Sequence, residues 1–210
     1  KDREVLRSLA EEGLKYRYGN PAPPVKARLE KELETIFQLG FTSYFLINWD
    51  IVRHAQHKNF YYIGRGSGAN SLVAYCLKIT DVDPIELDLY FERFINPSRK
   101  NPPDFDIDFS WRDRDEMTQY IFEKHGEKNV ALLATYSTFK HKAAIRELGK
   151  VFGLPDFEIE KLQSDNIRPD KADEYGKLIL TYANQLRSKP SHLSIHAGGV
   201  LIADKPISYY

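Results

Sequence analysis

Three aspartates alternate with apolar residues at positions 104–109. We predict that this run is a β-strand, in which alternate side chains point to the same face, so that Asp104, Asp106 and Asp108 lie together. The apolar residues between them then point into a core. Adjacent carboxylates repel one another unless cations neutralise them, and Mg²⁺ binds a few carboxylates, waters and substrate phosphates. The pattern predicts a magnesium site; the alternative is a solvated strand face with three ordinary surface acids.

A glycine-rich segment at residues 64–68, Gly-Arg-Gly-Ser-Gly, is expected to connect a strand to a helix. Glycines let the backbone approach an anion closely and adopt positive φ, and a helix N-terminus offers free N–H groups with a partial positive charge. Arg65 and Ser67 add further donors. The segment lacks the Gly-Lys-Ser/Thr ending of a P-loop and does not match the dinucleotide-binding fingerprint. We interpret it as a phosphate site, with a plain tight turn as the alternative.

The two motifs together predict a reaction. A loop that binds a triphosphate, followed by a strand that holds two divalent metal ions, is the layout for nucleotidyl transfer, in which one ion activates the attacking 3′-hydroxyl and the other stabilises the leaving pyrophosphate. Enzymes that add nucleotides without a template also pair a Gly-Ser loop with alternating acids, usually at shorter separation. A non-catalytic nucleic-acid-binding module is the other class to be weighed.

Hydrophobic spacing predicts the elements that must position these motifs. We expect helices at residues 4–17, 25–39, 43–57, 69–78, 112–125 and 138–152, a more polar helical stretch at 154–190, and strands at 60–63, 104–109, 130–134 and 200–203. Glycine and proline residues mark the breaks between them. The predicted fold class is α+β, with a mixed β-sheet and flanking helices.

Composition sets the broad class. The 210 residues carry a formal net charge of zero, which neither supports nor excludes nucleic-acid binding, because binding depends on where basic residues cluster. A single cysteine, Cys76, excludes an internal disulfide and favours an intracellular compartment. We expect no signal peptide and no membrane span. The chain starts inside an expected helix and stops just after an expected strand, so we expect a piece of a longer protein.

Several further segments follow the order and spacing of one known family. Together with the two motifs, the segments at 39–47, 69–75, 79–84, 91–97, 103–109 and 196–200 resemble bacterial C-family DNA polymerases, the alpha subunit of DNA polymerase III. The resemblance covers essentially the whole chain. It implies template-directed DNA synthesis, with nucleotidyl transfer from a dNTP to a primer 3′-hydroxyl.

The resemblance also assigns roles to residues. It implies that Asp106 and Asp108, and not Asp104, are the catalytic carboxylates that bind Mg²⁺, two ions in the complete enzyme. The incoming nucleotide would be bound by the glycine loop and by one further arginine, for which an exposed structural role is the alternative. These nucleotide-binding residues would be Gly64, Arg65, Gly66, Ser67, and Arg93 or Arg99.

Family architecture implies three parts. Residues 1–137 would form the first part of a nucleotidyltransferase-like palm, residues 138–195 a small helical thumb, and residues 196–210 the start of the return to the palm. Basic residues near helical spacing in the thumb would contact the primer–template backbone, with a solvated helix face as the alternative. These residues are Lys140, Lys142, Arg146 and Lys150.

The remaining expectations also rest on the family. Its third catalytic aspartate follows the segment at 196–200 beyond the end of this chain, so we expect no primer extension by the chain alone. Expected partners are primer–template DNA, dNTP and, through regions that the chain lacks, the sliding clamp and other replisome subunits, in the bacterial cytoplasm. Asn70 and the pair Pro102-Pro103 favour the error-prone branch, whereas Phe105 and His196 favour the replicative one. The branch is left open.

Overall fold

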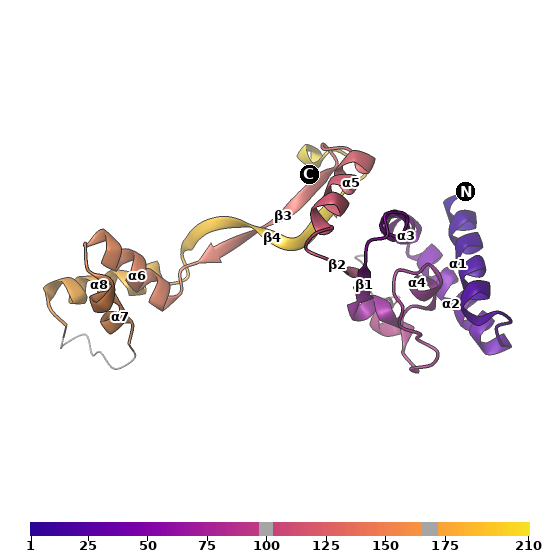
Figure 1. The fold of residues 1–210 in the computed structure, drawn as a ribbon, viewed down its shortest axis with the longest axis horizontal. Helices are drawn as coiled ribbons and strands as arrows, with labels where there is room; N and C mark the ends of the chain where they lie inside the picture. The colour runs from indigo at the N-terminus through magenta and orange to yellow at the C-terminus, as the bar shows by residue number, and fades with distance from the viewer. Residues whose placement is uncertain (97–102, 165–171) are drawn as a thin grey trace. The chain divides into compact units, whose positions relative to one another are not determined.

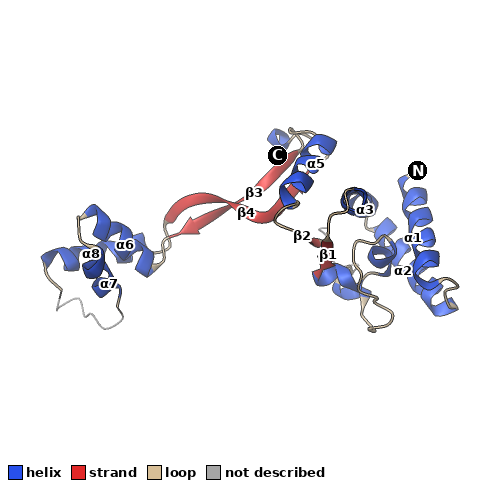
Figure 2. Ribbon diagram, viewed as in Figure 1, coloured by secondary structure: helices blue, strands red, loops and turns tan. Residues whose placement is uncertain are grey.

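The computed structural model describes residues 1–96, 103–164 and 172–210. The chain divides into two compact units, Lys1–Lys124 and His125–Tyr210, and each is described by itself (Figure 1). Helices dominate both units and the strands form two small sheets (Figure 2). The predicted α+β class is therefore confirmed.

The first unit contains helices and a short pair of strands. Four expected helices, those at 4–17, 25–39, 43–57 and 112–125, are confirmed within about two residues at each end, a difference that is within the usual uncertainty of helix boundaries. In chain order the elements are α1 (Asp2–Tyr18), α2 (Pro23–Gln38), α3 (Thr42–His57), β1 (Tyr62–Arg65), the 3₁₀ helix η1 (Gly66–Asn70), α4 (Leu72–Cys76), the 3₁₀ helix η2 (Phe91–Arg93), β2 (Asp106–Phe109) and α5 (Arg114–His125).

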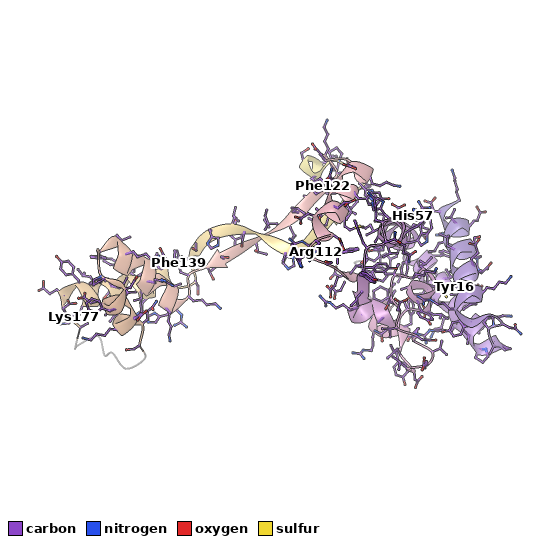
Figure 3. All side chains as sticks on the ribbon, viewed as in Figure 1. Tyr16, His57, Arg112, Phe122, Phe139 and Lys177 are labelled. Carbon is purple, nitrogen blue, oxygen red and sulfur yellow. The ribbon has the colours of Figure 1, made fainter. Side chains whose placement is uncertain are left out.

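One apolar core holds α1 to α4 together and lies directly behind the glycine loop. Leu6, Leu33, Phe45 and Phe94 are fully buried in it, and side chains fill the space between these helices (Figure 3). Burying one such side chain stabilises a fold by roughly 1.5–3 kcal/mol. This core is the rigid support on which β1 and η1 rest.

Two expected elements around the glycine loop differ from the structure. The strand expected at 60–63 is β1, which lies at Tyr62–Arg65 and therefore includes Gly64. The single helix expected at 69–78 is replaced by η1 and the five-residue α4. The reason is tertiary: pairing with β2 fixes the limits of β1, and Ser71, in an extended conformation, caps α4 by accepting a hydrogen bond from the Ala74 N–H.

The expected mixed sheet is not found among the described residues. β1 pairs antiparallel with β2, and β3 (Val130–Thr138) pairs antiparallel with β4 (Pro190–Ile202), giving two separate two-stranded sheets. Local periodicity indicates that a run is a strand but does not indicate its partner or direction, which is why this expectation was wrong.

The second unit is a long two-stranded ribbon with helices at one end (Figure 1). The strands expected at 130–134 and 200–203 extend to nine and thirteen residues as β3 and β4. The stretch expected to be helical at 154–190 forms two separate helices in its described part. The remaining elements are α6 (His141–Val151), α7 (Asp156–Gln163), α8 (Glu174–Leu186) and the 3₁₀ helix η4 (Ile207–Tyr209).

The helices of the second unit have a core of their own. Ala144 and Ile145 of α6 pack with Ile179, Leu180 and Ala183 of α8. All three helices lie in the chain between the end of β3 and the start of β4. The domain boundary expected at 137/138 falls at the end of β3, and the one expected at 195/196 falls within β4.

The segment His196–Gly199 interrupts the ribbon. Register passes from Leu132 paired with Val200 to Ala134 paired with Ile195, so four residues of β4 bulge opposite one residue of β3. The Gly198 N–H donates to Nδ1 of His196 at 3.2 Å.

None of the described helices has the length and apolar character that a membrane span requires.

Candidate active site

Strand pairing brings the glycine loop and the aspartates together. In the antiparallel register of β1 and β2, Arg65 lies opposite Asp106 and Ile63 lies opposite Asp108. The two motifs are far apart in sequence, and this sheet makes them neighbours. Asp106 and Asp108 are both on the exposed face of β2, as alternation predicts, while Ile107 packs on the core.

Arg65 joins the two carboxylates. Its Nε donates to Oδ2 of Asp108 at 2.6 Å, and its Nη1 donates to Oδ2 of Asp106 at 3.3 Å. The hydrogen bond and charge of Asp108, followed by the charge of Asp106, raise the pKa of the Arg65 guanidinium. All three side chains are exposed, with relative accessibilities of 57% for Arg65, 46% for Asp106 and 54% for Asp108. The site is therefore open to solvent and to ligands.

Asp104 does not belong to the paired strand. The strand expected from residue 104 begins at Asp106, and Asp104 is exposed before it. Phe105 fixes this entry: its N–H donates to the Tyr44 hydroxyl at 2.7 Å, and its ring stacks on that of Tyr44 at 5.3 Å between centroids. Tyr44 was not predicted as a site residue. Its position in α3 gave no local sign that it would meet β2.

Each glycine of the loop lies where a side chain would collide with a neighbour. An added Cβ on Gly64 would come within 1.8 Å of the Ile79 carbonyl oxygen, and one on Gly68 within 2.6 Å of the Phe105 ring. Gly66 has a φ of +73°, and a Cβ there would lie 2.5 Å from Oδ2 of Asp106. The loop is therefore packed tightly along its length, and at Gly66 it runs directly against the Asp106 carboxylate.

The helix N-terminus expected to bind phosphate is already occupied. The Val73 N–H at the start of α4 donates to Oε2 of Glu32 at 3.1 Å, and the Ser71 hydroxyl donates to the same oxygen at 2.9 Å. Arg28 donates from Nε to the other oxygen at 2.6 Å. Glu32 is completely buried. The expectation of free N–H groups from that helix was therefore wrong for α4, because an internal carboxylate fills the place of an external anion.

The buried Glu32 carboxylate belongs to a hydrogen-bond network that also holds the backbone next to the glycine loop. Arg28 also donates to the carbonyl oxygens of Asn70 at 3.2 Å and Leu89 at 3.1 Å, and Asn70 Nδ2 donates to the Ser67 carbonyl at 2.9 Å. Burial raises the pKa of Glu32, although its hydrogen bonds act in the opposite direction. Glu32 was also missed from sequence. The available signal was an acid on the apolar stripe of α2, next to Leu33.

Of the two arginines expected near the phosphates, the structure describes Arg93. Arg93 is exposed in η2, and η2 contacts η1, so it lies on an element adjoining the loop. Arg99 falls outside the described residues.

The predicted DNA-binding residues belong to the second unit. Lys142, Arg146 and Lys150 lie at intervals of four on α6, exposed and opposite the buried face that contains Ile145, and Lys140 precedes the helix. Lys150 forms an ion pair with Glu147 at 3.1 Å.

The donor set fits a divalent cation. Two half-exposed carboxylates on one strand face are oxygen ligands of the kind Mg²⁺ prefers, with room for waters and substrate oxygens. A guanidinium already lies across them as a cation. Within the described ranges, no group of three or more His, Cys, Asp and Glu side chains meets the geometry of a metal site, so the chain offers two carboxylates there and not a closed cage.

Comparisons with known proteins place this chain in one family. The profile described as the bacterial DNA polymerase III alpha NTPase domain matches residues 4–210. An error-prone DNA polymerase of Anaeromyxobacter sp. (strain K) is 38% identical over 97% of this chain and 20% of its own length. The DNA polymerase III subunit alpha of Bacillus subtilis (strain 168) is 38% identical over 98% of this chain and 20% of its own length.

The chain therefore belongs to the bacterial DNA polymerase III alpha family. It spans about a fifth of the length of these relatives. The relative named error-prone DNA polymerase and the one named DNA polymerase III subunit alpha reach the same identity, so these values do not choose between the two branches.

Proposed function

We propose that this chain supplies the incoming-nucleotide loop and two catalytic carboxylates of a template-directed DNA polymerase. The observation that carries the proposal is the pairing of β1 with β2, which puts Arg65 beside Asp106 and Asp108 on one open face. The reaction is nucleotidyl transfer from a dNTP to a primer 3′-hydroxyl. Two bound Mg²⁺ ions would supply activation of the hydroxyl and neutralisation of charge on the phosphates.

Each residue of the site has a proposed part in binding. Asp106 and Asp108 hold the metal ions. Gly66 and Ser67 present the start of η1 to the triphosphate at an edge of the loop that is not fully buried, and Arg65 adds donors and positive charge. Arg93 is a further candidate because its element adjoins the loop.

The rest of the proposed architecture follows the family. Residues 1–137 form the first part of the palm and residues 196–210 the return to it. Residues 138–195, which include α6, α7 and α8, form the thumb, whose basic face on α6 contacts the primer–template backbone. The proposed partners are DNA, dNTP and, through other regions of the polymerase, the clamp and replisome of the bacterial cytoplasm. Since the chain spans about a fifth of the length of its polymerase relatives, we propose that it does not extend primers by itself.

Calorimetry of dNTP binding with Mn²⁺ tests the site. The wild-type chain is compared with an Asp106→Asn, Asp108→Asn double variant and with the control Asp115→Asn, which removes an exposed carboxylate from α5. We expect metal-dependent binding by the wild type and the control, and its loss in the double variant. Equal binding by all three would contradict the proposal and favour a nucleic-acid-binding module whose aspartates are only surface. A primer-extension assay with template omitted distinguishes the template-independent class.

A further inference from the structure

One guanidinium lies in the place that the proposed function gives to a metal ion. Arg65 contacts Oδ2 of Asp106 and Oδ2 of Asp108 at the same time. A divalent cation and this guanidinium would both be drawn to the same pair of negative charges, and the two cannot occupy one position.

We propose that Arg65 is a place-holder for the metal: its guanidinium neutralises Asp106 and Asp108 while no divalent cation is bound, and it moves to the triphosphate when metal and nucleotide bind. This inference rests on the proposed function, because it takes the two aspartates as the metal ligands and the glycine loop as the triphosphate site.

The exposure of Arg65 makes this movement feasible. Its side chain is 57% exposed, so it can leave the carboxylates without opening the core. Arg28 in the same unit is the contrasting case: its side chain is only 22% exposed and is paired with the fully buried Glu32. Arg28 is therefore fixed, whereas Arg65 is held only by two surface ion pairs.

Arg65 lies at the junction between the strand β1 and the glycine loop. It is the last residue of β1, opposite Asp106, and it directly precedes Gly66, the first residue of η1. A side chain at this junction reaches the strand face on one side and the loop on the other. A guanidinium also suits both ligands, since its planar set of donors matches carboxylates and phosphates equally well.

The proposal predicts effects of opposite sign on two ligands. Without Arg65 the carboxylates lose a competitor, so metal alone binds more tightly; exposed ion pairs are weak, so the gain is about three- to tenfold. The triphosphate loses a partner, so nucleotide binds more weakly. If the ion pair were purely structural, loss of Arg65 would not change the metal affinity and the nucleotide affinity in opposite directions.

Titration with Mn²⁺ alone, followed by electron paramagnetic resonance, tests the first effect. The variants are Arg65→Gln, Arg65→Lys and the matched control Arg53→Gln, which removes an exposed arginine paired with Asp50 on α3. Each is also measured in the Asp106→Asn, Asp108→Asn background, and circular dichroism checks that all are folded. We expect tighter Mn²⁺ binding by Arg65→Gln, affinities near wild type for Arg65→Lys and Arg53→Gln, and loss of binding in the aspartate background.

The outcomes separate the inference from the function on which it rests. Equal Mn²⁺ affinity for Arg65→Gln and Arg53→Gln, with binding still dependent on the aspartates, overturns the place-holder and leaves the proposed function standing. Mn²⁺ binding that persists in the Asp106→Asn, Asp108→Asn background overturns both the place-holder proposal and the proposed function. The second effect is tested with dATP at saturating Mn²⁺: we expect at least about a threefold weaker affinity for Arg65→Gln, and an unchanged affinity would overturn the transfer of Arg65 to the triphosphate.

Discussion

The carboxylate of Glu32 accepts a hydrogen bond from the Val73 N–H at 3.1 Å, which places a buried charge of α2 at the first turn of α4. Arg28 provides its countercharge at 2.6 Å. The helices α2 and α4 are therefore tied together through one fully buried acid, and the consequences can be measured.

Replacing Glu32 with alanine should destabilise the first unit strongly. The change leaves Arg28 as an uncompensated, largely buried cation, a type of loss that costs about 3–5 kcal/mol. Urea unfolding followed by the fluorescence of Trp49 and Trp111, both in the first unit, measures it. Glu30→Ala, on the same helix, is the control: its pair with Arg7 is half exposed and should cost no more than about 1 kcal/mol. Similar losses for the two variants would contradict the role given to Glu32.

Gly64→Ala should disturb both stability and ligand binding. The new Cβ would meet the backbone of Ile79 at 1.8 Å, and a backbone atom cannot move aside as a flexible side chain can. We expect a loss of about 1–3 kcal/mol, typical of overpacking, together with weaker nucleotide binding. Gly198→Ala, where nothing lies within 4 Å, is the control. A Gly64→Ala variant that unfolds at the wild-type urea concentration would show that β1 can shift away from Ile79.

Mild acid should weaken the first unit partly through His54. Desolvation against the Tyr120 ring, 3.6 Å away between centroids, and the charge of Lys58 lower the pKa of His54. The unfolded chain then binds the proton more readily, so this contribution to stability is present above the unfolded pKa of about 6.5 and is lost as pH falls through the lower folded value.

Urea midpoints at pH 7.5 and 5.5 measure the contribution of His54. The His54→Gln variant should lose less stability on acidification than the wild type or the control His57→Gln. The difference is small, because the ring is only partly buried. Parallel losses in all three proteins would exclude His54 as a source of the acid sensitivity.

The basic face of α6 should bind DNA through phosphates. We expect Lys142→Gln with Arg146→Gln to weaken primer–template binding without changing sequence preference, and to lower the slope of log affinity against log salt by about 0.9 for each phosphate that the variant no longer neutralises. Fluorescence anisotropy at several salt concentrations measures both. Lys150→Gln should weaken binding less than Arg146→Gln alone, because Lys150 is paired with Glu147.

The control for α6 lies on another helix of the same unit. Lys177 is exposed on α8 (Figure 3), so Lys177→Gln removes one positive charge from a different surface and is compared with Arg146→Gln alone. An equal effect of Lys177→Gln would mean that overall charge, and not the α6 face, governs binding.

Local pattern predicted much of the first unit. The helices α1, α2 and α3 follow from apolar spacing and from breakers such as Gly19, which ends α1 with a φ of 64°. Alternation placed Asp106 and Asp108 on one face, and both are exposed there. It also extended the strand to Asp104, where the structure has no strand, because periodicity continues where strand pairing stops.

Relationships between distant segments could not be predicted in this way. The register that sets Arg65 opposite Asp106 depends on how β1 meets β2, and no local pattern contains it. The burial of Glu32 depends likewise on Ser71 and Val73, which lie on a different element. The length of the β3–β4 ribbon was underestimated because each of its strands is stabilised mainly by the other.

The ribbon of the second unit can be viewed as a hairpin whose turn has been replaced by a small domain. Cα pairing continues up to Thr138 and Pro190, and Phe139 and Lys189 close the junction with an N–H to carbonyl bond of 3.0 Å. The helices α6 and α8 between them share a core of their own around Ile145 and Ile179. Such an insertion is exchangeable: its two ends meet side by side, so it can be lengthened, swapped or replaced by a short turn while the register of the strands that carry it is kept.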